Sequence, residues 1–358
     1  MQRVIGPSGL GLMLLAGCQL ASQGGGSAGA DAGVAEGTTT TGESSLTLMP
    51  STSGVGELPD SGETSGVSTG TPTDDPTTSV DETGEDTDET GTGERPLPPP
   101  PPFVDVTLAP NLGSDQHDFG PTLRSDLLEI YFVSDRYNDL DIFVATRVST
   151  DQPWGLPQLV YGGVSTLANE THPELSPDGL ALAFSSDRDS DDYEVYFIVR
   201  DNVGGLWSQP EVIPSLGSPG QEFALTAQAD AQTVLFCSDR SPSDGIDVWR
   251  VLFDGARHSE PERLQDLASP GTDCPGTSSG DMTWLAMGSD RAGGMGDSDL
   301  WIAQQTESGE GYWPPHNLAE LNTTAAERDP WVSEDLGVIY FASDRSGDLE
   351  IYQARAQR

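Results

Sequence analysis

The chain has no lysine at all, and its positive charge comes from 16 arginines set against 58 acidic residues. The formal net charge of −42 excludes nucleic acid as an expected partner, because affinity for phosphates depends on clustered lysine and arginine. The motifs H-E-x-x-H and C-x-x-C and a phosphate-binding P-loop are also absent. Long apolar runs are missing as well, and no segment is apolar enough to span a bilayer.

The N-terminus carries the pattern of an export signal. Arg3 precedes a short apolar run that ends at Leu15, Ala16, Gly17 and Cys18. This ending resembles the cleavage box of bacterial lipoproteins, in which the peptide is cut before a cysteine that then carries the lipid. The resemblance implies that residues 1–17 are a signal peptide and that Cys18 is lipidated, with an ordinary secretory peptide as the alternative. Gln19, by resemblance to Gram-negative lipoproteins, favours the outer membrane.

A segment without aromatic residues follows. Residues 19–102 contain no Phe, Trp or Tyr and hold 15 acidic residues against one arginine. Such a composition buries too little apolar surface to offset the entropy lost on ordering. We therefore predict that residues 18–102 form a disordered tether ending in a polyproline spacer at residues 98–102, although unselected low-complexity sequence would look the same.

The remaining residues, 103–358, are a fivefold repeat. The tripeptide Ser-Asp-Arg begins at residues 134, 186, 238, 289 and 343. An apolar run precedes each tripeptide, and an acidic, an aliphatic and an aromatic residue follow it in order. The runs are short and rich in β-branched and aromatic residues, without helical periodicity. Period and strand count together predict a five-bladed β-propeller of four-stranded blades, with six blades as the alternative.

The ends of the chain predict how this ring closes. The last repeat stops before its fourth strand, whereas residues 104–108 form an extra strand before the first repeat. We expect this N-terminal strand to complete the last blade, because an unpaired edge would invite aggregation.

The second repeat carries a family resemblance. Its residues 173–179 read Pro-Glu-Leu-Ser-Pro-Asp-Gly, and Ser185-Ser186-Asp187-Arg188 follows after an apolar run. This pattern resembles the WD40-like propeller repeat of TolB-type periplasmic proteins, over roughly residues 103–358. The resemblance implies a propeller fold and envelope partners such as peptidoglycan-associated components.

Residues that recur in every repeat are interpreted as architecture, because catalysis needs a unique constellation. This applies to the Asp-Arg pairs, which we expect to tie strand ends together, and to Trp154, Trp207 and Trp313, which we expect to pack between blades. The sequence Gly276 to Gly280 matches the G-x-S-x-G nucleophile elbow but lies inside a predicted blade, so no catalytic residue is assigned.

One recurring set of acids is a candidate ligand site. Each acid precedes the innermost strand of its repeat, where a propeller would gather the set at one mouth of the central channel. There the carboxylates would bind a cation such as Ca²⁺ or repel one another and so have raised pKa values. The alternative is that they hydrogen-bond backbone amides at the strand start. The five acids are Asp118, Glu170, Glu222, Asp273 and Glu327.

Two cysteines and two histidines complete the candidates. Cys237 and Cys274 fall in neighbouring repeats, and we expect buried thiols, with a disulfide as the alternative. His117 and His172 lie close to the candidate acids of their repeats.

Together these patterns predict a monomeric, lipid-anchored, extracytoplasmic propeller that is a non-catalytic binding or scaffold module at the cell envelope. No cofactor is expected apart from the Ca²⁺ considered above. The membrane is reached through the lipid, and the acidic domain favours cations or cationic partners. The alternative function is a propeller-type glycosidase or lyase that uses carboxylates in the channel.

Overall fold

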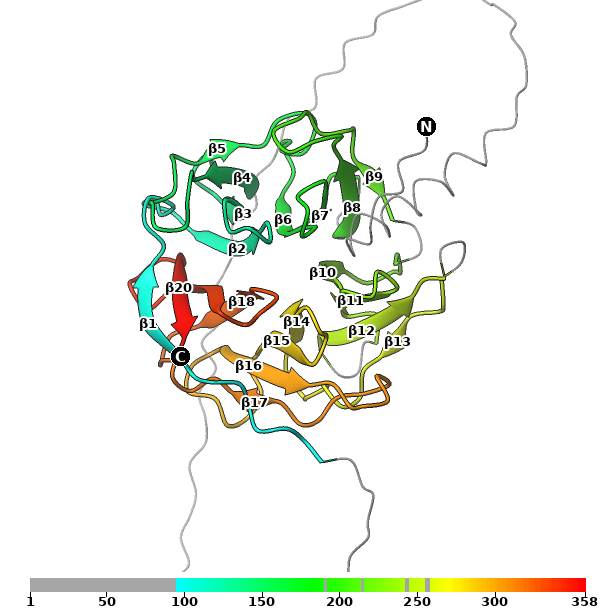
Figure 1. Cartoon of the computed structure of the whole chain (residues 1–358). Coiled ribbons are helices and arrows are strands. Elements are labelled where there is room, and N and C mark those ends of the chain that lie inside the picture. The colour runs from blue at the N-terminus through cyan, green and yellow to red at the C-terminus, as the bar shows by residue number, and fades with distance from the viewer. Residues whose placement is uncertain (1–94, 190–191, 214–215, 242–244, 255–257) are drawn as a thin grey trace, which may run out of the picture. The chain divides into compact units, whose positions relative to one another are not determined.

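The computed structural model describes residues 95–358 apart from 190–191, 214–215, 242–244 and 255–257. The predicted signal peptide, Cys18 and the tether up to residue 94 lie outside the described residues. The described part is all β, with five four-stranded antiparallel sheets arranged as the blades of a propeller (Figure 1). The predicted fold class is thereby confirmed. Within these residues no helix is long and apolar enough to cross a membrane.

The four positions of each blade are occupied by equivalent strands. Along the central axis the innermost strands of the first to fifth blades are β2 (Asp118–Leu123), β6 (Glu170–Leu175), β10 (Glu222–Ala227), β14 (Asp273–Ser278) and β18 (Glu327–Val332). The second strands are β3 (Glu129–Ser134), β7 (Ala181–Ser186), β11 (Thr233–Ser238), β15 (Trp284–Ser289) and β19 (Val338–Ser343). The third strands are β4 (Asp141–Thr146), β8 (Glu194–Val199), β12 (Asp247–Leu252), β16 (Asp299–Gln304) and β20 (Glu350–Ala356). The outermost strands are β5 (Gln158–Leu159), β9 (Glu211–Val212), β13 (Glu262–Arg263), β17 (His316–Asn317) and, in the fifth blade, β1 (Phe103–Leu108).

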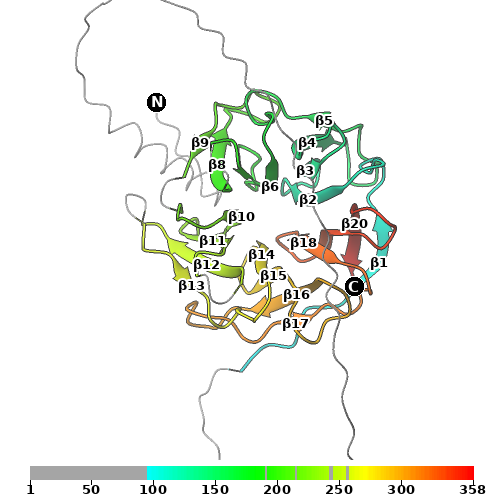
Figure 2. The ribbon, with the colours of Figure 1, turned by 180° about the vertical axis from the view of Figure 1, so that it is seen from behind.

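The ring is closed by the N-terminal strand, as predicted. β1 pairs antiparallel with β20, and Phe103 lies opposite Ala356 in the register. The first and last parts of the propeller therefore share one sheet, and Figure 2 shows β1 and β20 side by side from behind. Ala109 then donates a backbone hydrogen bond to Ile351 O (2.8 Å) as the chain passes into the first blade.

The hydrophobic core consists of layers between successive blades. Five clusters of buried residues each combine side chains from two neighbouring sheets. Trp154 of the first blade is buried against Tyr340 of the fifth, and Trp207 of the second packs edge-on against Tyr131 of the first. The predicted inter-blade packing is thus confirmed for these two tryptophans. Because each layer needs both of its sheets, no blade can bury its apolar surface alone.

Every innermost strand contains an irregularity in its pairing. The register shifts between the second and fifth residue in four of them, and in β2, β6, β10 and β18 the third residue has a positive φ, between 47° and 60°. In β14 that place is taken by Pro275, whose ring forbids a positive φ, and Gly276 follows. A Cβ on Gly276 would stand 2.0 Å from Pro330 O, so only glycine fits where β14 approaches β18.

Cys237 in β11 and Cys274 in β14 form a disulfide between the third and fourth blades. Their Cα atoms are 5.3 Å apart, within the range that a bridge can span. The expectation of free thiols was therefore wrong. Cys237 lies next to the end of a second strand and Cys274 lies in the next innermost strand, so the stacking of neighbouring blades brings the two side chains together.

Ring closure yields a first prediction. Phe103 is 1% exposed and anchors β1 in the layer between the fourth and fifth blades. Phe103→Ala should lower the free energy of unfolding by about 3–5 kcal/mol, measured by urea denaturation, because it leaves a cavity beside the closing strand. Leu108→Ala, at the 49% exposed end of the same strand, is the control and should cost less than about 1 kcal/mol. Equal losses at both sites would contradict this account of closure.

Candidate functional site

The recurring acids each form the centre of a hydrogen-bond network inside one blade. In the fourth blade, Asp273 accepts bonds from Arg291 Nη2 (2.6 Å), Ser289 Oγ (2.6 Å) and the backbone N of Ser269 (2.6 Å). The same Arg291 nitrogen also donates to Leu267 O (2.6 Å). The network therefore fixes the loop before the innermost strand to the end of the second strand.

The same network occurs in all five blades. Its ion pairs join the recurring acid to the arginine of the Ser-Asp-Arg tripeptide eighteen residues later, namely Asp118–Arg136, Glu170–Arg188, Glu222–Arg240, Asp273–Arg291 and Glu327–Arg345. Each guanidinium also stacks over at least one aromatic ring of its blade, such as Arg240 over Phe236 (4.8 Å). The tripeptide's aspartate is not the arginine's partner here. It accepts a hydrogen bond from a backbone N–H just before the innermost strand, as Asp290 does from Thr272 N.

These contacts bear directly on the candidate ligand site. Asp118, Glu170, Glu222, Asp273 and Glu327 are all fully buried. Burial raises the pKa of Glu170 and Glu222, rather than the mutual repulsion that the sequence suggested. In the part of the chain that the structure describes, no three His, Cys, Asp or Glu side chains converge as a metal ion would require. The geometry matches the structural alternative, in which the acids bind strand-start amides, and Ca²⁺ binding stays a prediction that no contact here supports.

The centre of the ring contains two small cavities lined by all five innermost strands. Their volumes are about 40 and 80 Å³, room for a few water molecules. The fifth residue of each innermost strand faces this channel region and is Thr122, Glu174, Thr226, Thr277 or Trp331. Glu174 is therefore the one ionisable residue at this position.

Glu174 bridges its two neighbours in the ring. Its carboxyl accepts hydrogen bonds from Thr226 Oγ1 (3.1 Å) and Thr122 Oγ1 (3.4 Å). The side chain is half-buried in the channel, and the loss of hydration there raises the pKa of Glu174 to about 8, although the two threonine bonds oppose the rise. The carboxyl is consequently protonated at neutral pH.

His172 and Asp329 line the smaller of the two channel cavities, which Glu174 also lines. His172 stacks near Phe223 (5.1 Å between ring centroids), and burial lowers the pKa of its imidazole, a shift that the negative charge of Asp329 opposes. The Oδ2 atom of Asp329 is buried without a hydrogen-bond partner among the described residues. The sequence analysis had placed His172 close to Glu170 instead. His117, the other histidine considered there, accepts a hydrogen bond from Leu349 N and so joins the fifth blade to the first.

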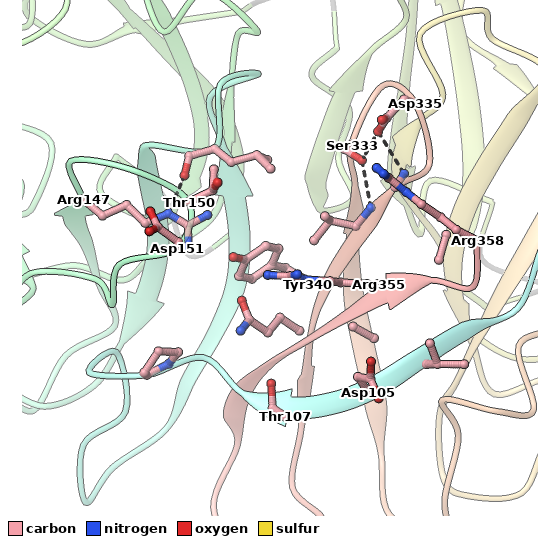
Figure 3. Close-up of a pocket in the computed structure, with 18 of the residues that line it drawn as sticks. Asp105, Thr107, Arg147, Thr150, Asp151, Ser333, Asp335, Tyr340, Arg355 and Arg358 are labelled. Atoms are coloured by element: carbon pink, nitrogen blue, oxygen red, sulfur yellow. Dashed lines mark hydrogen bonds between the residues drawn. The ribbon is translucent and has the colours of Figure 1, made fainter.

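A larger cavity opens between the fifth and first blades. This groove has a volume of about 990 Å³ and is bounded by β1, β19 and β20 on one side and by residues 147–153 on the other. Figure 3 shows the hydroxyl of Tyr340 pointing toward Arg147, with Arg355 reaching alongside the tyrosine ring. We call it the closing groove, because the N-terminal strand that closes the ring forms part of its wall.

Sequence reasoning missed the closing groove and gave Glu174 no role. Glu174 was read only as part of the repeat signature, although three of the other four repeats have threonine at that position. The departure of Glu174 from the repeat was therefore the signal in the sequence that could have identified it. No signal in the sequence indicated the closing groove, because its walls come from opposite ends of the propeller sequence.

Comparison with known proteins identifies the fold alone. No protein-family model matches the chain, and no curated protein sequence does. Among solved structures, the endo-arabinase from Bacteroides thetaiotaomicron VPI-5482 is similar over 70% of this chain and 98% of its own, at 14% identity and a TM-score of 0.50. TolB from Acinetobacter baumannii is 17% identical over 69% of this chain, with a TM-score of 0.44, and the chain spans 56% of its length. The α-L-arabinofuranosidase from Podospora anserina, solved with cellotriose, is 13% identical, with a TM-score of 0.48, over 73% of this chain and 98% of its own.

These likenesses correct one expectation. We predicted that the chain is not an enzyme, because nothing chemical stood out against the repeat. The endo-arabinase, an enzyme, has a similar fold, so a repetitive propeller does not establish that a chain is not an enzyme, and the prediction was wrong.

The buried ion pairs yield a second prediction. Asp273→Asn should lower the free energy of unfolding by about 3 kcal/mol or more, because it leaves Arg291 without its buried counter-charge. The matched control is Glu262→Gln, which also neutralises the acid of an arginine ion pair, but one whose side chain is 64% exposed. Its cost should be below about 1 kcal/mol. Urea denaturation of both variants provides the measurement, and similar losses would contradict the role assigned to burial.

Glu174 yields a third prediction, on pH. Its folded pKa of about 8 lies above the ordinary value of 4.5, so the folded state holds a proton that the unfolded state releases between these values. Stability should therefore fall as pH rises from about 5 to 8, by at most about 1.4 kcal/mol per pH unit for this group. Glu174→Gln should remove this group's part of the fall, so that the stability of the variant relative to the wild type increases as pH rises. Thermal unfolding measured over this pH range provides the test, and parallel pH profiles for the two proteins would contradict the prediction.

Proposed function

We propose that the protein is a lipid-anchored, extracytoplasmic propeller that binds a ligand in the closing groove at the cell envelope. The observation that carries the binding role is the groove itself. Its volume of about 990 Å³ lies at the upper end of the range of small-molecule sites, whereas the two channel cavities hold only water-sized groups. Both walls are built from strands and short turns, so the groove is preformed.

The cellular location rests on the sequence. Arg3, the apolar run and Cys18 fit an export signal followed by lipidation, and the acidic residues after Cys18 fit a tether between membrane and propeller. Several acyl chains anchor a protein stably, because each buried methylene contributes about 0.8 kcal/mol.

A fourth prediction tests the anchor. In a Gram-negative host, the wild-type protein should sediment with membranes and partition into a detergent phase. Cys18→Ser should release it into the soluble fraction, because the thiol that would carry the lipid is gone. A Cys18→Ser protein that stays with the membrane at the wild-type level would contradict lipid anchoring.

The binding role is tested by blocking the groove. Thr107 on β1 lines the groove and is exposed, whereas the next residue, Leu108, is outside its lining. Thr107→Trp should abolish the capture of envelope components by the full-length protein in detergent, and Leu108→Trp should leave capture intact. Loss of capture in both variants, or in neither, would contradict binding in the groove.

A second function, glycoside hydrolysis in the channel, is favoured by one observation. The raised pKa of Glu174 leaves its carboxyl able to donate a proton to a leaving group, and Asp329 has a buried carboxylate oxygen without a partner among the described residues. Because the two cavities hold only a few water molecules, a glycan would have to reach these groups from the mouth of the channel. This function predicts release of reducing sugar from an arabinose-containing glycan, the class named for the similar endo-arabinase. Glu174→Gln and Asp329→Asn should each abolish that release. No activity in the wild type would exclude this function and leave the binding role unaffected.

A further inference from the structure

One junction between blades contains a complete binding site for a carboxylate. Arg200 of the second blade stacks over Trp207 (4.4 Å) and donates from its Nε to Gly179 O (2.6 Å). Its two terminal nitrogens bind both oxygens of Glu129, at 2.7 and 3.1 Å, across the junction with the first blade. The Tyr131 hydroxyl donates to the same carboxylate (3.1 Å). Arg124 of the first blade also pairs with Glu129 Oε2 (3.0 Å). Arg200, Trp207 and Tyr131 thus form a cradle, with Arg124 beside it, that Glu129 fills.

The junction between the fifth and first blades repeats this cradle. Arg147 stacks over Trp154 (4.1 Å), and its Nε donates to Leu127 O (2.7 Å). Trp154 packs edge-on against Tyr340, with ring centroids 6.5 Å apart. The charge of Arg147 lies close enough to the Tyr340 hydroxyl to oppose the rise in its pKa that burial causes. Arg147, Trp154 and Tyr340 are therefore arranged in the same way as the arginine, tryptophan and tyrosine at the junction of the first and second blades.

The carboxylate is missing at this second cradle. Glu129 is the first residue of β3, and the first residue of β19, which takes the same place in the fifth blade, is Val338. Among the described residues, no carboxylate lies within 4.0 Å of the Arg147 guanidinium. Arg355 lies opposite Val338 in the register and brings a second guanidinium to the same place.

The space that a carboxylate would need is open. Arg147, Val338, Tyr340 and Arg355 all line the closing groove, and Figure 3 shows Arg147 near the hydroxyl of Tyr340 and Arg355 alongside the ring. The nearby Asp335 accepts bonds from Ser333 Oγ and Gly337 N at its Oδ1 atom, within its own turn, and forms no ion pair with Arg147. Nine of the fourteen arginines among the described residues form ion pairs, and Arg147 and Arg355, which line the groove, are among the five that do not.

We propose that the closing groove binds a ligand through a carboxylate group, which takes the place that Glu129 holds at the neighbouring junction. Arg147 binds both carboxylate oxygens, the Tyr340 hydroxyl donates to one of them, and Arg355 adds a second positive charge. This inference rests on the binding role proposed for the groove and names the chemistry of its ligand. The carboxylate can come from an acidic amino acid or from an acidic sugar.

Calorimetry with the full-length protein in detergent tests the proposal. The acidic probes are N-acetylglutamate amide and glucuronate, and their neutral counterparts are N-acetylglutamine amide and glucose. At least one acidic probe should bind while its neutral counterpart does not, and binding should weaken as salt is raised. Which acidic probe binds distinguishes a peptide source from a sugar source. Binding of neither acidic probe, or equal binding of a neutral counterpart, would overturn the proposal.

Variants assign the binding to the cradle. Arg147→Met should weaken it by about tenfold or more, whereas Arg328→Met should not, since Arg328 is an exposed arginine outside the groove. Val338→Glu should abolish binding while the protein keeps its cooperative thermal transition, because the new carboxylate would fill the cradle as Glu129 does. Binding that survives in a folded Val338→Glu protein would overturn the proposal.

Failure of the carboxylate proposal can be distinguished from failure of the binding role. If neither acidic probe binds but Thr107→Trp still abolishes capture from envelope extract, the groove binds a ligand of other chemistry. If Thr107→Trp has no effect on capture either, both proposals fail.

Discussion

The structure depends on one interaction that occurs five times, the buried ion pair between the acid that begins each innermost strand and the arginine eighteen residues later. Burying either charge alone would be costly, and the pair offsets that cost only because serine hydroxyls and backbone groups satisfy the remaining bonds. Each pair fixes the loop before the innermost strand of a blade to the end of the second strand. The five pairs thus set where each blade begins relative to its neighbour, while the apolar layers between blades supply most of the stabilisation.

Most of the fold could be predicted from the sequence because it repeats. The Ser-Asp-Arg tripeptides gave the number of blades, and the unmatched strand at residues 104–108 gave the closure. The roles of single residues were harder. The acids and the tripeptide arginines had been considered separately, although their constant spacing of eighteen residues could have joined them. The Cys237–Cys274 disulfide depends on how two sheets stack, which a repeat period does not reveal.

The functional candidates are the places where the repeat fails. Glu174 replaces a threonine in a ring of channel residues. The cradle of Arg147 and Tyr340 has Val338 where the neighbouring cradle has Glu129, which is the one carboxylate at the start of the five second strands. Neither change improves the architecture. A glutamate in the channel loses hydration, and a valine opposite a fixed guanidinium leaves that charge without its partner. Positions that depart from a repeat at an energetic cost are good places to look for a selected function.

An anionic ligand for so acidic a domain requires a physical explanation. Residues 103–358 hold 43 acids against 14 arginines, so the field at long range repels a carboxylate, and the composition had suggested cationic partners. Salt screens that field within about 8 Å at physiological ionic strength, whereas a contact in a partly enclosed groove is screened much less. Recognition in the closing groove would therefore depend on short hydrogen bonds from Arg147 and Tyr340 rather than on steering. Slow association and strong discrimination against neutral analogues would follow, since a ligand without a carboxylate leaves both donors unsatisfied.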